Sequence, residues 1–201
     1  MNFKNRLILI IPGLFLTILS YGQTHKTITE YLGVAGPISF DKFSYNLTWT
    51  SHPTDNYYKQ EYLVKGDTIE KFKKLILLET ITGKTKLKDV VATKVTELKK
   101  MKAANPVVNY ESFEKDGEVM VDFLLSENTP DGKYLSIVER NVYRYKSVIE
   151  KNGQKCVLLF GVSERAYGDD IDKFLINLKE HRYDLINSVG AFVIPDISIA
   201  K

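Results

Sequence analysis

The sequence predicts an α+β fold in which one antiparallel β-sheet is flanked by two main helices. Three dipeptides that favour tight β-hairpin turns follow one another in the second half of the chain, at Asp116-Gly117, Asp131-Gly132 and Asn152-Gly153. Segments with an apolar stripe at helical spacing lie on either side of them, at 87–102 and 171–189. One sheet with both helices packed against it would bury each stripe.

The first 22 residues have the three parts of a secretory signal peptide. Lys4 and Arg6 make the start positive, and residues 7–19 form an apolar stretch. That stretch is shorter than the roughly 20 apolar residues that a membrane-spanning helix needs. Gly22 provides a small residue before a cleavage point, so we expect export to the periplasm or beyond and removal of residues 1–22. An N-terminal membrane anchor that stays attached is the alternative.

Composition argues against several functional classes. The chain has 28 basic and 25 acidic residues, a balance that provides no argument for nucleic-acid binding. Its single cysteine, Cys156, precludes an internal disulfide, and the apolar run that follows it predicts a buried strand with an inert thiol. Cysteine and histidine show no zinc-type spacing and no glycine-rich phosphate loop occurs, so no cofactor or metal is expected.

The remainder reads as one unit, with a loose lead-in at 23–37 and a single domain at 38–201. A first strand is predicted at 43–50, where apolar and polar side chains alternate. The alternation places four large side chains on one face: Phe43, Tyr45, Leu47 and Trp49. The polar segment 51–56, which contains a proline, is expected to break this strand. Two more strands are predicted at 57–64 and 72–81.

The second half begins with the helix predicted at 87–102, which Asn105-Pro106 would end. Four strands follow, which the hairpin dipeptides would join into a meander: 108–113, 118–125, 134–147 and 154–163. Gly168-Asp169-Asp170 then introduces the second helix, in which an aspartate would serve as N-cap. We expect this helix to continue unbroken to Gly190.

This element order resembles the PsbP-like α+β sandwich over residues 38–194. The closing pattern supports the resemblance: Phe160-Gly161, Tyr167-Gly168, Phe174-Leu175 and Leu185-Ile186. The chain also resembles small exported proteins of Bacteroidetes-type Gram-negative bacteria, whose signal peptides have similar Tyr-Gly-Gln endings. PsbP-like proteins mostly bind or stabilise assemblies, so the resemblance implies a non-enzymatic role.

Two regions combine residue types that are common at recognition surfaces, because tyrosine provides rigid contact area with a polar tip and interface hot spots favour tyrosine and arginine. The candidate binding residues are His52, Tyr57, Tyr58, Tyr62, Glu164, Arg165 and Tyr167. On the strand predicted at 57–64, Tyr58 and Tyr62 would share one face and Tyr57 the other. The first hypothesis is an exported, non-enzymatic protein that binds a protein or small molecule of the cell envelope. Structural roles in the sheet and in its connections are the alternative for both regions.

The alternative function is a hydrolase or another enzyme that acts on envelope material. Its candidate residues would be His52, Asp55, Glu139 and Glu164, although no spacing links them. Seven lysines at 84–102 could contact an anionic membrane surface, but a solvated helix face explains them more simply. Asp67-Thr68-Ile69 resembles a short acceptor motif for O-glycosylation of exported proteins, so Thr68 is a candidate for modification.

Overall fold

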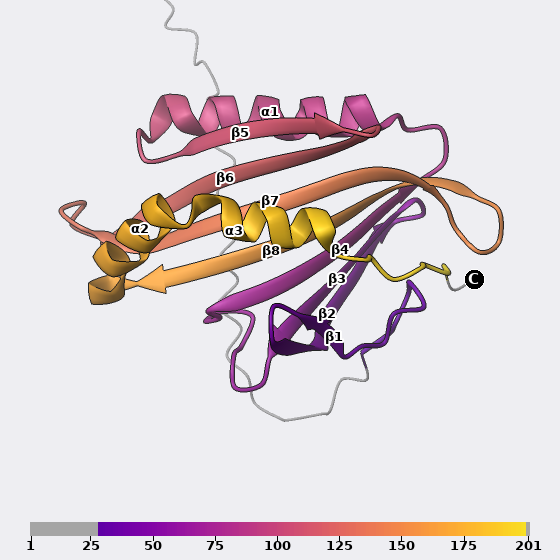
Figure 1. Ribbon diagram of the computed structural model, residues 1–201, viewed down its shortest axis with the longest axis horizontal. Coiled ribbons are helices and arrows are strands. Elements are labelled where there is room, and N and C mark those ends of the chain that lie inside the picture. The colour runs from indigo at the N-terminus through magenta and orange to yellow at the C-terminus, as the bar shows by residue number, and fades with distance from the viewer. Residues whose placement is uncertain (1–27, 200–201) are drawn as a thin grey trace, which may run out of the picture.

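The computed structural model describes residues 28–199, and the expected signal peptide, residues 1–22, lies outside this range. Within residues 28–199, eight antiparallel strands form one sheet with the order β1-β2-β3-β4-β8-β7-β6-β5 (Figure 1). The strands are β1 (Ile38–Phe40), β2 (Phe43–Thr54), β3 (Tyr57–Val64), β4 (Lys74–Thr82), β5 (Asn109–Lys115), β6 (Glu118–Asn128), β7 (Leu135–Ile149) and β8 (Lys155–Tyr167). The strand that comes last in sequence, β8, therefore lies between β4 and β7.

Three α-helices of the described chain cover the two faces of the sheet (Figure 1). They are α1 (Leu87–Ala104), α2 (Ile171–Glu180) and α3 (Arg182–Ala191), with a 3₁₀ turn at Gly168–Asp170 before α2. Helix α1 contacts β5 and β7 on one face, here called the α1 face, whereas α2 and α3 pack on the opposite, α2–α3 face. The expected α+β class is confirmed. None of the described helices has both the length and the apolar character needed to cross a membrane.

The sheet separates two main apolar cores. On the α2–α3 face, Tyr62 and Phe160 of the sheet pack with Val189 of α3. On the α1 face, Leu98 of α1 packs with Val121 and Phe123. Because both faces are buried over the central strands, apolar side chains occupy consecutive positions there, as in the run of buried residues in β8.

The predicted meander is confirmed. Asp116-Gly117 forms the turn between β5 and β6, where both residues have positive φ angles of 53° and 77°. This left-handed conformation is what a two-residue hairpin loop requires. The other two dipeptides, Asp131-Gly132 and Asn152-Gly153, lie in the connections that precede β7 and β8.

Strand β2 differs from the prediction, because segment 51–56 does not end it. The strand continues to Thr54 through two irregularities in its pairing with β3. At the first of them, Leu47 pairs with Tyr62 whereas Trp49 pairs with Glu61. One extra residue thus rotates Trp49 onto the α1 face, so the expectation that it shares a face with Tyr45 is wrong.

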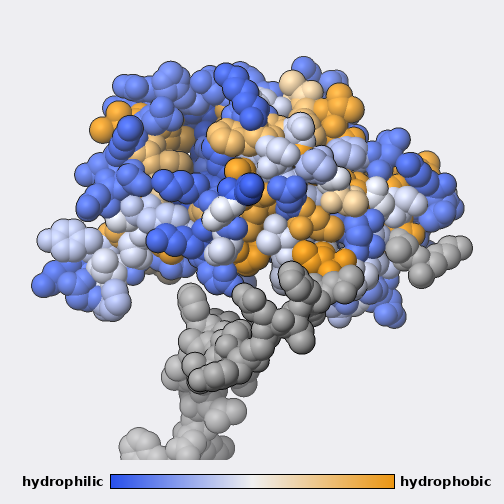
Figure 2. All heavy atoms as spheres, turned by 90° about the horizontal axis from the view of Figure 1, so that it is seen from below, coloured by the Kyte–Doolittle hydropathy of each residue, from blue (hydrophilic) through white to orange (hydrophobic). Residues whose placement is uncertain are grey.

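At the edge of the sheet formed by β1 and β2, two large apolar side chains are partly exposed. Strand β1 pairs only with residues 43–45, so β2 is the outermost strand beyond Tyr45. Phe43 and Trp49 are about two-fifths exposed. Figure 2 views the molecule from the side on which β1 and β2 lie in Figure 1, and apolar patches appear there among polar side chains.

The single helix expected at 171–189 is instead two helices. His181, with φ −120° and ψ 28°, leaves the helical conformation between α2 and α3. The next residue, Arg182, is held by ion pairs to Asp122 and Glu111 of the sheet, which fix the start of α3. Gly190 does not stop the helix, because α3 continues to Ala191.

Both ends of the described chain attach to the same region of the domain. The Glu30 carboxylate accepts hydrogen bonds from the backbone N–H groups of Leu32, Gly33 and Val34. Leu32 is fully buried, and its carbonyl accepts a 2.8 Å bond from the N–H of Ser198. These residues of the lead-in expected at 23–37 are therefore held in place by the C-terminal tail.

Candidate functional site

The three candidate tyrosines of β3 alternate between faces as expected. Tyr58 and Tyr62 belong to the core of the α2–α3 face, and Tyr57 lies on the α1 face. Tyr62 is fully buried and donates a 2.6 Å hydrogen bond to the carbonyl of Val34. Tyr62 thus joins the N-terminal segment to the sheet and offers no surface for a partner.

His52 forms part of an aromatic cluster at the β2–β3 hairpin. Its exposed ring stacks on Tyr58, with ring centroids 4.1 Å apart, and Tyr31 lies 5.5 Å from it. The Nδ1 atom of His52 lies 3.0 Å from the Tyr57 carbonyl oxygen. Tyr58 itself is only 9 % exposed, so His52 covers much of the ring that was expected at the surface.

The second candidate region is part of a strand, because β8 extends beyond the predicted end at residue 163 through Tyr167. Glu164 forms an ion pair with Lys74 on the α2–α3 face. Arg165 lies on the other face, where it pairs with Glu139. The seven candidate binding residues therefore do not converge on one site.

On the α1 face, Arg165 and Tyr167 instead hold the β3–β4 connection. The guanidinium carbon of Arg165 lies 4.0 Å from the ring centroid of Phe72. The Tyr167 hydroxyl donates a 2.9 Å hydrogen bond to the Phe72 carbonyl. Both contacts are structural in character, because they join the end of β8 to the segment that precedes β4.

The candidates for an enzymatic site are also dispersed. His52 and Asp55 belong to the β2–β3 hairpin, whereas Glu139 and Glu164 lie on β7 and β8 with separate basic partners on opposite faces. Acid–base or nucleophilic chemistry needs such groups within hydrogen-bond reach of one another or of a common substrate. The structure does not bring these four residues together.

A groove of about 500 Å³ lies between α1 and the strands beside it. The sheet contributes Tyr57, Lys59, Glu79, Ile81, Tyr143, Tyr145 and Leu159. The helix and the turn before it contribute Thr85, Asp89, Val90, Thr93, Lys94 and Glu97. We call this cavity the α1 groove. It contains Tyr57 of the seven candidates, together with polar residues that the sequence analysis did not select.

The groove exists because α1 covers only one half of the α1 face of the sheet. Leu98, the only fully buried residue of the described helix, packs over β6 against Val121 and Phe123. The groove therefore lies between β4 and β7 on one side and a neighbouring row of helix residues on the other. That row includes Thr93, Lys94 and Glu97. A helix centred over β4 would close this space.

Glu79 is the carboxyl group at the floor of the groove. Its side chain is 21 % exposed, and burial raises its pKa above the ordinary value. The Lys59 ammonium, 3.9 Å away, and hydrogen bonding with the Tyr57 hydroxyl oppose this shift without cancelling it. Glu79 is therefore a carboxyl group whose charge is only partly compensated by its surroundings.

Three tyrosines surround this carboxyl group. Burial raises the pKa of Tyr57, Tyr143 and Tyr145, and the negative charge of Glu79 is the second cause for each of them. Their hydroxyl groups thus stay protonated at physiological pH and can donate hydrogen bonds. Such a set can orient a ligand through several hydroxyl groups around one acidic group.

Two lysines flank Glu79 on either side. Lys59 lies 2.8 Å from Glu61 and 5.5 Å from the ring of Trp49, which extends the polar and aromatic surface toward β2. On the opposite wall, Lys94 lies 5.9 Å from the ring centroid of Tyr143 and pairs with Glu97 at 2.8 Å. One of the seven lysines that the sequence assigned to a solvated helix face thus borders the groove.

Sequence patterns offered one signal for this site. Strand β4 reads Lys-Leu-Ile-Leu-Leu-Glu-Thr-Ile-Thr, so Glu79 is the only acidic residue in a strand that is otherwise mostly buried. A charged group in such a strand is rare unless it is paired or functional. No sequence pattern could have indicated that Tyr143 lines the groove, because its place there depends on where α1 packs on the sheet.

Within residues 28–199, the structure contains no cluster of three or more His, Cys, Asp or Glu residues that could hold a metal ion. A model of a protein family matches residues 32–194, a range that includes the whole sheet, the three helices and the α1 groove. A comparison with curated proteins gave no match.

Proposed function

The chain belongs to the uncharacterised family whose model covers residues 32–194. Since membership of this family indicates no function, we propose one from the geometry of the α1 groove. The protein is a non-enzymatic binding protein of the bacterial envelope, and it holds a small polar ligand in the α1 groove. Its signal-peptide-like N-terminus supports export, and its resemblance to the PsbP-like sandwich supports a binding or assembly-support role.

The observation that carries this proposal is the composition of the groove. It is a cavity of about 500 Å³, within the usual range for small-molecule sites. Its floor has the half-buried carboxyl group of Glu79, whose pKa is raised by burial. Perturbed ionisable groups in a cleft are a recognised mark of functional sites.

The types of side chain favour binding over catalysis. The groove is lined by tyrosine, lysine, glutamate, aspartate, threonine and aliphatic residues, and among its lining residues there is no serine, cysteine or histidine. The four residues expected for a hydrolase lie elsewhere and apart. Glu79 and its tyrosines instead match a ligand with hydrogen-bond donors and a flat apolar part that can lie against an aromatic ring.

Affinity selection followed by mass spectrometry would test this function. The mature chain, residues 23–201, would be incubated with the small-molecule fraction of its native envelope, and bound species would be released and identified. We expect the wild-type protein to retain a species that Glu79→Gln and Tyr57→Phe retain at least tenfold less.

Matched controls keep the comparison specific. Glu114→Gln changes an exposed carboxyl group on β5, and Tyr134→Phe changes an exposed tyrosine in the β6–β7 connection. Both controls should retain the species as the wild type does. Equal retention by all five proteins, or no retained species above that of denatured protein, would refute a binding role for the groove.

A further inference from the structure

A second cavity, of about 280 Å³, lies on the opposite side of the sheet from the α1 groove. It is bordered by α2 and α3, by β7 and β8, and by the turn between β1 and β2, and part of its lining is exposed to solvent. Its polar lining consists of Asp41, Arg140, Glu164, Asn177, His181, Asp184 and Ser188. Its apolar lining consists of Phe174, Leu178 and Leu185. We call it the polar cavity.

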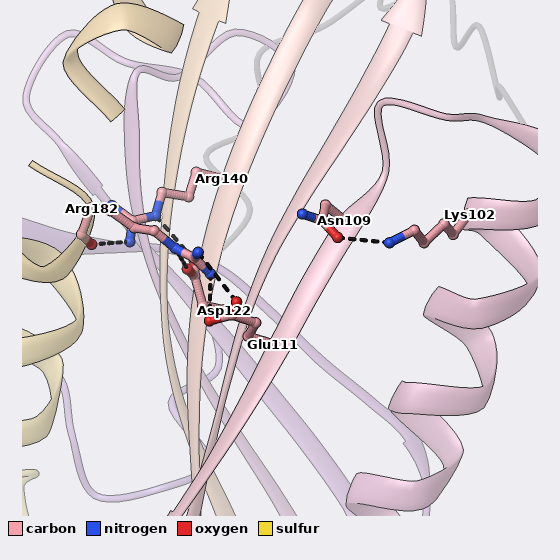
Figure 3. A network of polar contacts seen from close by, with 6 residues as sticks. All are labelled: Lys102, Asn109, Glu111, Asp122, Arg140 and Arg182. Carbon is pink, nitrogen blue, oxygen red and sulfur yellow. Dashed lines mark hydrogen bonds and ion pairs between the residues drawn. The ribbon is translucent and has the colours of Figure 1, made fainter. Parts of the chain in front are cut away.

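Arg140 provides a buried cationic group at this cavity. Its side chain is 4 % exposed, and its Nε atom donates a 3.1 Å hydrogen bond to Asp122 (Figure 3). A second nitrogen, Nη2, donates to the carbonyl oxygen of Arg182. Among residues 28–199, no group accepts a hydrogen bond from its third nitrogen, Nη1.

The Arg140 guanidinium is fixed in place by its neighbours. Arg182 also bonds to Asp122, at 3.2 Å, and to Glu111, at 2.8 Å, so one carboxylate bridges two arginines (Figure 3). Directly opposite Arg140 in the β7–β8 pairing lies Glu164. The sheet therefore presents a fixed arginine donor beside a carboxylate acceptor to the cavity.

The mixture of groups limits the class of ligand. A free anion would meet the three carboxylates of Asp41, Glu164 and Asp184, and like charges held close together repel one another. A simple cation would meet Arg140 and the Lys74 ammonium that pairs with Glu164. A fully apolar ligand would leave most of the lining without hydrogen-bond partners.

A neutral molecule with several hydroxyl groups fits all of these groups. Each hydroxyl both donates and accepts, so it can bond to a carboxylate and to an arginine, asparagine or serine in turn. The apolar side of a sugar ring, formed by its C–H groups, can pack against Phe174 and Leu178. A volume of about 280 Å³ has room for one such ring and little more.

We propose that the polar cavity binds one neutral hexose unit, through hydrogen bonds to Arg140, Glu164 and Asn177. The site is independent of the α1 groove, because the two cavities lie on opposite faces of the sheet and share no lining residue. The hexose is either a free sugar or the terminal unit of a glycan, and the two sources present the same hydroxyl groups.

Isothermal titration of the mature chain with D-glucose, D-galactose and D-mannose tests the proposal. At least one of these sugars should bind saturably at concentrations up to about 10 mM. Glucuronate and glucosamine, which add a negative or a positive charge to the same ring, should bind at least tenfold more weakly. The methyl glycoside of the binding sugar separates the two sources: unchanged affinity indicates a terminal glycan unit, and lost affinity indicates a free sugar.

Two variants and one matched control assign the site. Asn177→Ala and Glu164→Gln should weaken hexose binding at least tenfold, and thermal melts would show that each variant folds. Asn187→Ala removes the same side chain from an exposed position of α3 that lines a different cavity, and it should bind as the wild type does. Glu79→Gln should also leave hexose binding unchanged, whatever its effect at the α1 groove.

Three outcomes would overturn the proposal. They are the absence of binding by all three neutral sugars, equal or tighter binding of the charged sugars, and an equal loss in Asn187→Ala and Asn177→Ala.

Discussion

At the scale of single residues, Thr80 is a buried side chain with an unsatisfied polar atom. It lies in the middle of β4, fully buried, and among the described residues its hydroxyl oxygen has no hydrogen-bond partner. A buried polar group without a partner costs about 1–3 kcal/mol of folding free energy. Valine has nearly the same shape and is as well suited to a strand.

We therefore predict that Thr80→Val stabilises the protein by about 1 kcal/mol. For a domain of this size, that gain corresponds to a rise of about 2–4 °C in melting temperature. Ser163→Ala is the contrasting variant, because it removes the 2.5 Å hydrogen bond to the Asn141 side chain and should lower the melting temperature. A lower melting temperature for Thr80→Val would show that the hydroxyl does have a partner.

Glu79 makes stability depend on pH. Because burial raises its pKa in the folded protein, ionising it costs more in the folded than in the unfolded state. That cost is absent below the ordinary pKa of 4.5 and complete above the raised value. Its contribution to stability is therefore present in acid and is lost as the pH rises.

The neutral variant Glu79→Gln should thus be more stable than the wild type at pH 7, and the advantage should vanish as the pH falls below 4.5. Urea unfolding at a series of pH values would measure it, with Glu114→Gln as the exposed control. If Glu79→Gln is the less stable protein at pH 7, the pairing with Lys59 outweighs the cost of burial.

Cys156 lies in a buried strand, as its sequence context indicated. It is buried in β8, and burial raises the pKa of its thiol to about 11. Only a very small fraction is thiolate at neutral pH, so the thiol is a poor nucleophile.

At the scale of secondary-structure elements, α1 begins without a side-chain cap. Its N-cap residue, Lys86, has an extended backbone whose carbonyl accepts hydrogen bonds from the N–H groups of Asp89 and Val90, but its side chain offers no acceptor to the N–H groups of the first turn. Serine at this position would accept one of these N–H groups, and Asp89 at the third helical position could reciprocate. Replacing a poor N-cap by serine is worth about 0.5–2 kcal/mol.

Lys86→Ser should therefore stabilise the protein by about 1 kcal/mol, measured as a higher melting temperature. Lys88→Ser is the matched control, because the same change inside the first turn provides no cap and lowers helix propensity slightly. If both variants change stability in the same direction and by the same amount, capping is not the cause.

Elements defined by local chemistry were the ones that sequence patterns predicted well. The three connections of the meander and the start of α1 at Leu87 depend on residues adjacent in the chain, and the structure has them where they were expected, although of the three dipeptides only Asp116-Gly117 forms a two-residue turn. The face of Trp49 depends on one extra residue in the pairing of β2 with β3, which an alternating pattern cannot reveal. The break at His181 depends on ion pairs between Arg182 and a distant strand.

The candidate site was only partly predictable for the same reason. Tyr57 was selected from its residue type, and it does lie in the α1 groove. Tyr143 and Lys94 join it only because α1 packs toward β6 and leaves part of β4 uncovered. Tyr62 looked equally suitable in sequence, yet the N-terminal segment covers it completely.

At the scale of the whole molecule, the N-terminal sequence predicts export. The mature protein should begin at Gln23, because cleavage after Gly22 fits the small residue there and the short apolar stretch before it. Intact-mass analysis of the protein isolated from its native envelope would measure this directly. A mass that still includes residues 1–22 would favour the retained membrane anchor instead.

The central position of β8 has a consequence for the time course of folding. Ribosomes and export channels deliver a chain with its amino end first, so β8 appears after the other seven strands of the described sheet. Until then β4 and β7 are open edges, which are prone to pair with other chains. The β4–β8 pairs join residues as much as 90 positions apart, and such high contact order slows folding. An exported chain with this topology would stay unfolded through most of its translocation and would benefit from a chaperone on arrival.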